Sequence, residues 1–172
     1  MDENNSIFHI RGDDFIQYNS EDDWVGNYFY GFPNASVLKN FSGIYAFTLC
    51  GEVVYVGSSV NLFNRFRTHI ISIQHGDNCK SPSIADRKYY YLNKYIENVE
   101  FKVLATYDKH MSKQDLEQRE HQYINIYQPI FNVNYMDKVK RWCGSDRDID
   151  EFVNGNTTIA DLQRQMKSMT KL

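Results

Sequence analysis

The expected fold is decided by the stretch Gly43-Ile44-Tyr45-Ala46-Phe47-Thr48-Leu49, Cys50-Gly51-Glu52, Val53-Val54-Tyr55-Val56-Gly57. Two segments rich in β-branched and aromatic residues flank a short break that contains glycine, which predicts a β-hairpin. With a three-residue loop at 50–52, Leu49 pairs with Val53 and Tyr45 pairs with Gly57. Tyr45 and Tyr55 then share one face, whereas a two-residue loop predicts opposite faces.

Two helices are expected after the hairpin. Ser58 or Ser59 can cap the first helix, and apolar residues recur along it at helical spacing. The second helix begins at Ser81-Pro82, a serine cap followed by proline at the first helical position. The predicted buried faces are Leu62, Phe66, Ile70 and Ile73 in the first helix and Ala85, Tyr89, Leu92 and Ile96 in the second.

One more strand and one more helix follow. Apolar residues alternate over 101–105, which predicts a third strand. Ser112, with Asp115 three residues later, resembles a capping box and opens a helix that runs to about Tyr127 and stops before Pro129. The predicted fold class is therefore α/β, with a small three-stranded antiparallel sheet flanked by helices.

Three segments are distinguished along the chain. Residues 1–40 form an acidic, aromatic-rich N-terminal extension that we expect to be ordered and packed on the main domain. Residues 41–135 form the main domain, and residues 136–172 form a short helical C-terminal tail. In that tail, a turn at Asn154-Gly155-Asn156 separates two helical patterns, which could be the first two helices of a helix-turn-helix.

Composition limits the classes of protein. Hydrophobic residues make up 42% and charged residues 24% of the chain, which is typical of a globular domain. No apolar run approaches the ~20 residues of a membrane-spanning helix, and the acidic N-terminus is unlike a signal peptide. The three cysteines form no Cys-x-x-Cys pair, so neither a disulfide framework nor a zinc site is predicted. A soluble, cytoplasmic protein without membrane association is expected.

The charge distribution is uneven. The net charge of -3 argues mildly against nucleic acid binding. Residues 1–30, however, carry seven acids against one base, whereas residues 61–102 carry seven bases against four acids. The basic segment can contact nucleic acid, although a solvated helix face has the same composition.

Glu120 is the most informative single position. It falls on the same helical stripe as Leu116, Tyr123 and Tyr127, so a carboxylate is expected among apolar side chains. Burying an unpaired carboxylate costs several kcal/mol, which predicts either a cationic partner or a metal ion. An internal salt bridge satisfies this requirement as well as a metal site does.

Arg65 and His69 provide a second pair of candidates. They are four residues apart on the helix after the hairpin and share a face beside its apolar stripe. A guanidinium can bind phosphate oxygens in a bidentate fork, and an imidazole can move protons near neutral pH. Their spacing alone also fits a solvated helix edge.

In order and spacing, these motifs resemble the GIY-YIG nuclease family. The match consists of Gly43-Ile44-Tyr45, Tyr55-Val56-Gly57, the helix around Arg65 and His69, the helix around Glu120, and Pro129-Ile130-Phe131-Asn132. The motifs extend over roughly 90 residues. The resemblance implies that Glu120 holds one divalent ion, Mg²⁺ or Mn²⁺, at a scissile phosphate, where oxygen ligands suit such an ion. It further implies that Arg65 stabilises charge on that phosphate.

The resemblance also implies roles for the remaining polar residues. Tyr45, with His69, would deprotonate or orient the attacking water, and Tyr55 would hydrogen-bond in the same pocket. Asn132 would brace the site. The identity of the general base stays open, because an ordinary tyrosine has a pKa near ~10 and needs a cation nearby to lower it.

The implied function is a metal-dependent DNA endonuclease of a stand-alone phage type or restriction type. DNA is the expected partner, and a homodimer is possible. The alternative is a catalytically silent module that keeps the fold to bind DNA or another protein. Such a module has no physical need for all six polar residues, so their joint presence favours the enzyme.

Overall fold

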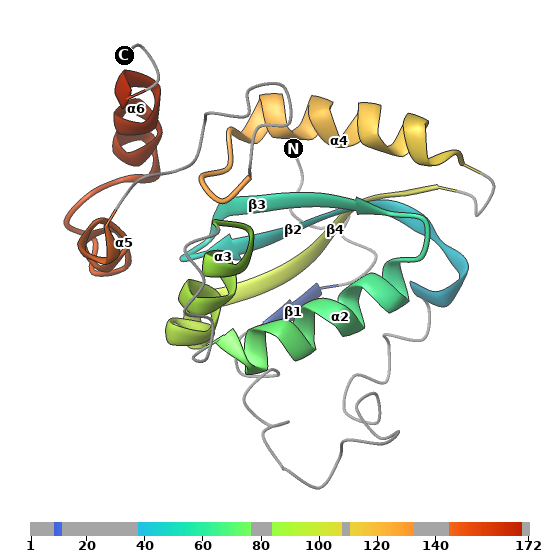
Figure 1. The fold of residues 1–172 in the computed structure, drawn as a ribbon, viewed down its shortest axis with the longest axis horizontal. Helices are drawn as coiled ribbons and strands as arrows, with labels where there is room; N and C mark the ends of the chain where they lie inside the picture. The colour runs from blue at the N-terminus through green and yellow to red at the C-terminus, as the bar shows by residue number, and fades with distance from the viewer. Residues whose placement is uncertain (1–8, 12–37, 77–83, 108–110, 133–144, 170–172) are drawn as a thin grey trace, which may run out of the picture.

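The computed structural model describes residues 9–11, 38–76, 84–107, 111–132 and 145–169 (Figure 1). A sheet lies between helix α4 on one face and helices α2 and α3 on the other. The strands are β1 (His9–Arg11), β2 (Ser42–Leu49), β3 (Glu52–Ser59) and β4 (Val99–Tyr107), in the order β1-β4-β2-β3. Each neighbouring pair is antiparallel.

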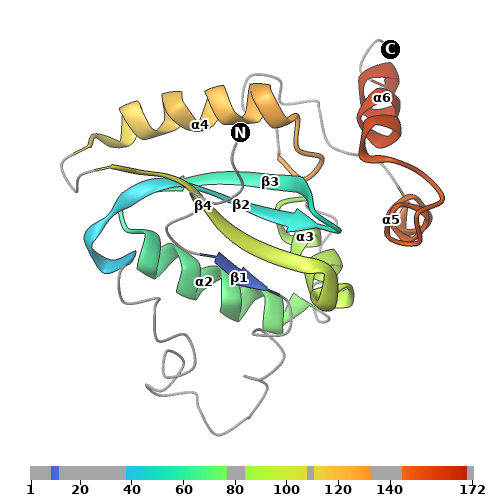
Figure 2. The same cartoon turned by 180° about the vertical axis from the view of Figure 1, so that it is seen from behind.

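The three predicted strands are confirmed, and β1 adds a fourth at the far edge of the sheet. Ile10 pairs with Phe101 of β4, and the rear view in Figure 2 shows β1 beside that strand. Residues 9–11 of the N-terminal extension therefore pack on the main domain. A strand of three residues is too short to produce a recognisable alternation, which is why the sequence did not reveal it. The aromatic-rich part at 12–37 lies outside the described residues.

The hairpin turn differs from the prediction. Its loop contains two residues, Cys50 and Gly51, and both have positive φ angles of 53° and 84°, as a type I′ turn requires. Leu49 consequently pairs with Glu52 and not with Val53, so the predicted three-residue loop is wrong. A β-bulge between Phe47 and Thr48 then shifts the pairing of the two strands by one residue, so that Phe47 pairs with Tyr55 as predicted. Tyr45 still pairs with Gly57, because the bulge compensates for the shorter loop.

Helix α2 (Leu62–Gln74) follows the hairpin, and the predicted stripe Leu62, Phe66, Ile70 and Ile73 is buried. The predicted cap is wrong, because the N-cap is Asn61, whose side chain accepts a hydrogen bond from the Asn64 backbone N–H. Helix α3 (Ile84–Lys94) and the short 3₁₀ helix η5 (Ile96–Asn98) come next. The predicted Ser81-Pro82 start lies outside the described residues.

Helix α4 (Lys113–Tyr127) confirms the predicted bounds. The Ser112 side chain caps it by accepting a hydrogen bond from the Asp115 backbone N–H, and Gln128 ends it in the left-handed conformation. Two helices follow in the tail, α5 (Asp146–Val153) and α6 (Ile159–Met169), and they flank the predicted turn. None of the described helices is long and apolar enough to cross a membrane.

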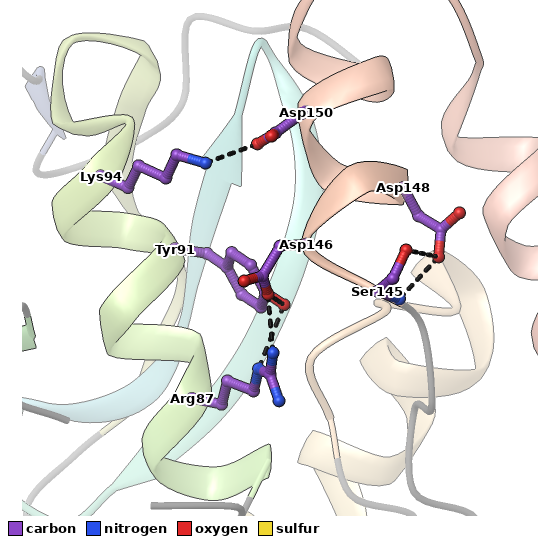
Figure 3. A network of polar contacts seen from close by, with 7 residues as sticks. All are labelled: Arg87, Tyr91, Lys94, Ser145, Asp146, Asp148 and Asp150. Carbon is purple, nitrogen blue, oxygen red and sulfur yellow. Dashed lines mark hydrogen bonds and ion pairs between the residues drawn. The ribbon is translucent and has the colours of Figure 1, made fainter. Parts of the chain in front are cut away.

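The first tail helix, α5, packs on α3 (Figure 3). The Asp146 carboxylate accepts hydrogen bonds from Arg87 at 2.7 Å and from the buried Tyr91 hydroxyl at 2.6 Å. Lys94 forms a second ion pair with Asp150 at 2.7 Å. The apolar residues Ile149, Phe152 and Leu162 join the same core as α2, α3 and one face of the sheet. A smaller core on the other face lies under α4, around Ile44, Ala46, Val56 and Leu116.

Candidate active site

A pocket of about 490 Å³ opens where β3, the edge strand, passes between α2 and α4. Four of the six predicted site residues line it: Tyr45, Tyr55, Arg65 and Glu120. The other two lie behind the lining. His69 contacts Tyr45, and Asn132 contacts the backbone of β3. All six predicted residues therefore surround one location, although they come from four separate elements and a loop.

Tyr45 and His69 form a buried hydrogen-bonded pair. The Tyr45 hydroxyl lies 2.6 Å from His69 Nε2, and the two side chains are 1% and 2% exposed. His69 Nδ1 lies 2.8 Å from the hydroxyl of Tyr89 on α3. Because His69 is buried, it does not belong to a solvated helix edge, and that alternative is excluded for this residue.

Gly57 leaves the space that Tyr45 occupies. A Cβ atom at Gly57 would meet the Tyr45 hydroxyl at 2.4 Å, far inside van der Waals contact. Gly57 stands opposite Tyr45 across the hairpin. The glycine of the second tripeptide thus accommodates the tyrosine of the first, as the sequence predicted.

Burial controls the protonation of both groups. It raises the pKa of Tyr45 well above its usual value, and repulsion from Tyr55 adds to the shift, whereas Arg65 lowers it only in part. Burial lowers the pKa of His69 well below its usual value, and Lys88 and Arg65 add to that shift. We expected a nearby cation to bring the pKa of the tyrosine down, but burial outweighs Arg65. Tyr45 is therefore a phenol and His69 a neutral imidazole at pH 7.

Tyr55 lies beside this pair. Its ring centroid is 6.2 Å from that of Tyr45, and the Lys88 ammonium lies 4.5 Å from the ring centroid of Tyr55. Burial, followed by repulsion from Glu120, raises the pKa of Tyr55. Tyr55 therefore carries its proton and can donate a hydrogen bond in the pocket.

Glu120 projects from α4 into the pocket and is half-buried, not enclosed as its apolar stripe suggested. Its Oε2 atom accepts a hydrogen bond of 2.5 Å from Ser58 Oγ on β3. Within the described part of the chain, Glu120 takes part in no ion pair. An internal salt bridge thus finds no support there, and the carboxylate remains open to the pocket.

Arg65 is exposed and borders the same pocket from α2. Arg65 and His69 are one helical turn apart, but His69 turns into the core whereas Arg65 reaches the opening. A long side chain at the mouth of a pocket can contact a bound anion without paying for burial of its charge.

Asn132 holds the edge strand in place. Its side-chain amide donates to the Val56 carbonyl at 2.7 Å and accepts from the Val56 N–H at 2.8 Å. Val56 stands between Tyr55 and Gly57, so these two bonds fix the stretch of β3 that lines the pocket. The structure thus places Asn132 against the strand that lines the pocket, and its role in the reaction stays a prediction.

Sequence reasoning missed three residues that contact the site: Ser58, Lys88 and Tyr89. The sequence pattern presents Ser58 only as a candidate helix cap, but its alternation with Val56 directs it toward α4 and Glu120. Lys88 is only 7% exposed, and its ammonium lies 4.7 Å from the Tyr89 ring centroid. Lys88 lies at helical spacing between Ala85 and Leu92 of the predicted buried face, and this position could have indicated a buried cation.

The donor chemistry suits a hard divalent ion. Among the described residues, no three His, Cys, Asp or Glu side chains come close enough to hold a metal by themselves. Mg²⁺ does not need such a cage, because it keeps several waters and binds through one or two carboxylates together with phosphate oxygens. Glu120 fits that pattern, since its carboxylate faces the pocket and its neighbour Ser58 offers a second oxygen.

No protein-family model matches the chain, and no curated protein matches it. Solved structures of the GIY-YIG N-terminal endonuclease domain of UvrC from Thermotoga maritima do match. The chain is similar to GIY-YIG endonuclease domains. One of these structures, bound to its catalytic divalent cation, magnesium, is 20% identical and has a TM-score of 0.38; the match covers 59% of this chain and 94% of that one. A tyrosine variant and an asparagine variant of the same domain, each bound to a catalytic divalent cation, are 18% and 19% identical, with the same TM-score and 60% of this chain covered. These neighbours come from the family that the sequence motifs resemble.

Proposed function

We propose that this protein is a metal-dependent DNA endonuclease that hydrolyses phosphodiester bonds. One observation carries the proposal: a single pocket is lined by a carboxylate that pairs with no cation in the described part of the chain, by an exposed arginine, and by a tyrosine that is hydrogen-bonded to a buried histidine behind it. A divalent ion, an anionic phosphate and an attacking water need these three kinds of group.

Each residue then has a defined role. Glu120 would hold a divalent ion, Mg²⁺ or Mn²⁺, which supplies positive charge at the scissile phosphate. Arg65 binds non-bridging oxygens of that phosphate from the mouth of the pocket. Tyr55 donates a hydrogen bond to the same group, and Asn132 keeps Tyr55 in place through Val56.

Tyr45 positions the attacking water, with His69 behind it. A water oxygen forms the new bond to phosphorus and the bond to the leaving deoxyribose oxygen breaks, which gives one phosphate monoester end and one hydroxyl end. The proton of the water passes to the Tyr45 oxygen while the Tyr45 proton moves to His69 Nε2, and the leaving oxygen takes up a proton from solvent. His69, whose pKa is lowered, then returns its extra proton to solvent through Tyr45. The order of the groups supports this route, because Tyr45 lines the pocket and His69 lies directly behind it at 2.6 Å.

The biological setting that we propose is a stand-alone phage-type or restriction-type enzyme that acts on DNA in the cytoplasm. The solved GIY-YIG domain of UvrC to which the chain is similar binds a catalytic divalent cation, the same class of cofactor that we propose here. The fold and the pocket are compatible with either type.

The proposal is tested by incubating the purified protein with supercoiled plasmid and with single-stranded DNA, each in Mg²⁺, in Mn²⁺ or in a chelator. We expect nicked or linear DNA with either ion and none with the chelator, and sequencing of the ends then reports the recognition site. Retarded DNA without cleavage in any of these conditions would contradict the proposal and favour the silent binding module.

A further inference from the structure

His69 has a second polar contact, on the side of its ring away from the pocket. Nε2 faces Tyr45 at 2.6 Å and Nδ1 faces the hydroxyl of Tyr89 at 2.8 Å. In a neutral imidazole one ring nitrogen donates a hydrogen bond and the other accepts one. The direction of the bond to Tyr89 therefore decides the direction of the bond to Tyr45.

The groups around His69 keep it neutral. Aromatic rings of Tyr45 and Phe47 from β2, Tyr55 from β3 and Tyr89 from α3 pack against the imidazole. The charged groups that act on it are the cations Lys88 and Arg65, and both oppose a positive charge on the ring. His69 thus exists as one of two neutral tautomers, and hydrogen bonds select between them.

Tyr89 is held firmly in this contact. Its backbone carbonyl lies so close to Gly76 that a Cβ atom there would meet the oxygen at 2.2 Å. The Asn93 side chain donates a hydrogen bond of 2.9 Å to the Ile73 carbonyl and ties the same part of α3 to the last turn of α2. The distance between Tyr89 and His69 is therefore set by tight packing of two helices.

Only one tautomer suits the proposed role of Tyr45. If Nε2 carried the proton, it would donate to the Tyr45 oxygen, and the phenolic proton would point away from His69, toward the pocket or toward Tyr55. Tyr45 could then not pass its own proton to Nε2 when it takes one from the water. If Nδ1 carries the proton, Nε2 accepts from the Tyr45 hydroxyl, and the lone pairs of Tyr45 face the pocket.

We propose that Tyr89 is a positioning residue whose hydroxyl oxygen accepts the Nδ1–H of His69 and so leaves Nε2 free to accept from Tyr45. This arrangement places the proton on the nitrogen that is less often protonated in a histidine in water. The value of the arrangement for catalysis rests on the proposed nuclease function, whereas the tautomer is a property of the folded protein alone.

The tautomer is measured by long-range ¹H–¹⁵N correlation spectra of the protein labelled with ¹⁵N-histidine at pH 7.5, with His69 assigned by the loss of its signals in His69→Gln. We expect the Nδ1–H pattern in the wild type and a shift to the Nε2–H pattern or to a mixture in Tyr89→Phe. Tyr90→Phe, a matched change on the neighbouring side chain, leaves the wild-type pattern. An Nε2–H pattern in the wild type, or an unchanged pattern in Tyr89→Phe, would overturn the proposal.

The effect on cleavage is measured separately. Tyr89→Phe lowers kcat roughly tenfold or more at unchanged KM, since general acid–base groups contribute about 10²–10⁴-fold and this residue acts through one of them. In a His69→Gln background the same change has no further effect, as expected for a residue that acts only through His69. Fully additive effects would overturn the positioning role. A wild-type protein that does not cleave DNA would sink the nuclease proposal, and the spectra would still decide the tautomer.

Discussion

A methyl group at Gly57 would lie 2.4 Å from the hydroxyl oxygen of Tyr45 and 2.6 Å from its Cζ atom, so the position of Tyr45 depends on the missing side chain of Gly57. Gly57→Ala therefore displaces Tyr45 from His69. We expect cleavage to fall about 10²-fold or more, the size of effect that follows loss of one acid–base group, and the protein to lose roughly 1–3 kcal/mol of stability by overpacking.

Gly51→Ala is the matched control for this prediction. Gly51 has a φ of 84° and no atom within 4 Å of the position that its Cβ would take. Alanine there strains the turn at a cost of about 1 kcal/mol without touching the pocket. Cleavage is followed on plasmid and stability by denaturant titration. If Gly57→Ala and Gly51→Ala cut equally well, the contact between Gly57 and Tyr45 has no catalytic importance.

Glu120→Gln separates a metal ligand from a structural ion pair. A glutamine keeps the shape and can still accept the hydrogen bond from Ser58, but it lacks the charge that holds a divalent ion. Cleavage should vanish, and the melting temperature should hardly change, whereas breaking a buried ion pair would cost about 3–5 kcal/mol. Metal-free DNA binding should persist or tighten, because a negative charge near the phosphate backbone is gone.

The control for Glu120→Gln is Glu97→Gln in η5. Glu97 is exposed and does not line the pocket. This variant should cleave normally and keep its stability, since surface substitutions usually change stability by no more than about 0.5 kcal/mol. An unfolded or still active Glu120→Gln protein would remove the metal-ligand assignment.

Arg65→Lys tests whether geometry or charge matters at the mouth of the pocket. A lysine keeps the charge but cannot reproduce the planar fork of the guanidinium on two phosphate oxygens. We expect the cleavage rate to drop roughly 10²-fold or more, as after loss of an oriented donor. Arg67→Lys, on an exposed position that does not line the pocket, should keep the wild-type rate. Equal rates for the two variants would mean that Arg65 is only a surface charge.

The buried, neutral His69 predicts a loss of stability in mild acid. Its pKa is lowered in the folded state, so below the ordinary value of about 6.5 the unfolded chain binds a proton that the folded protein does not. Stability then falls as the pH drops through that range, by up to about 1.4 kcal/mol per pH unit. Unfolding free energies at pH 7.5, 6.5 and 5.5 should fall less steeply in His69→Gln than in the wild type. The other histidines are present in both proteins, so their contribution cancels when the two pH dependences are compared. Equal slopes of unfolding free energy against pH would refute the conclusion that His69 is buried and neutral.

The attachment of the tail gives a fifth prediction. Asp146 accepts a hydrogen bond from the hydroxyl group of the fully buried Tyr91, whereas Asp150 makes only a surface ion pair with Lys94 (Figure 3). Asp146→Ala should destabilise the protein by about 1–2 kcal/mol, because it removes the acceptor of a buried donor. Asp150→Ala, on the same helix, should cost about 0–1 kcal/mol. Thermal melts of both variants check the difference, and equal shifts would show that the Tyr91 hydroxyl does not depend on Asp146.

Local patterns predicted most of the secondary structure. The bounds of α4 follow from its serine cap and from the nearby proline, and the buried stripe of α2 follows from helical spacing. The hairpin shows where such reasoning stops. A two-residue turn and a bulge each shift the register by one residue, and the two shifts cancel. The facing of Tyr45 and Gly57 was therefore predicted correctly, although the loop was not.

The site was predicted less completely than the fold. The motif residues could be named because the resemblance supplied them, but their order along the chain gives no distances. Tyr89 and Lys88 approach His69 only because α2 and α3 pack side by side, and that contact is tertiary. The burial of Tyr45 and His69, which sets their protonation, likewise depends on side chains from three elements.

The amide of Asn132 also has a consequence for assembly. The loop after α4 occupies outward-facing backbone groups of the edge strand. The Asn132 side chain bonds both the N–H and the carbonyl of Val56, and the Phe131 N–H donates to the Val54 carbonyl at 2.8 Å. Exposed edges invite a further strand from another molecule. This edge is closed along Val54–Val56, so a strand from a second molecule cannot pair with the sheet at that stretch.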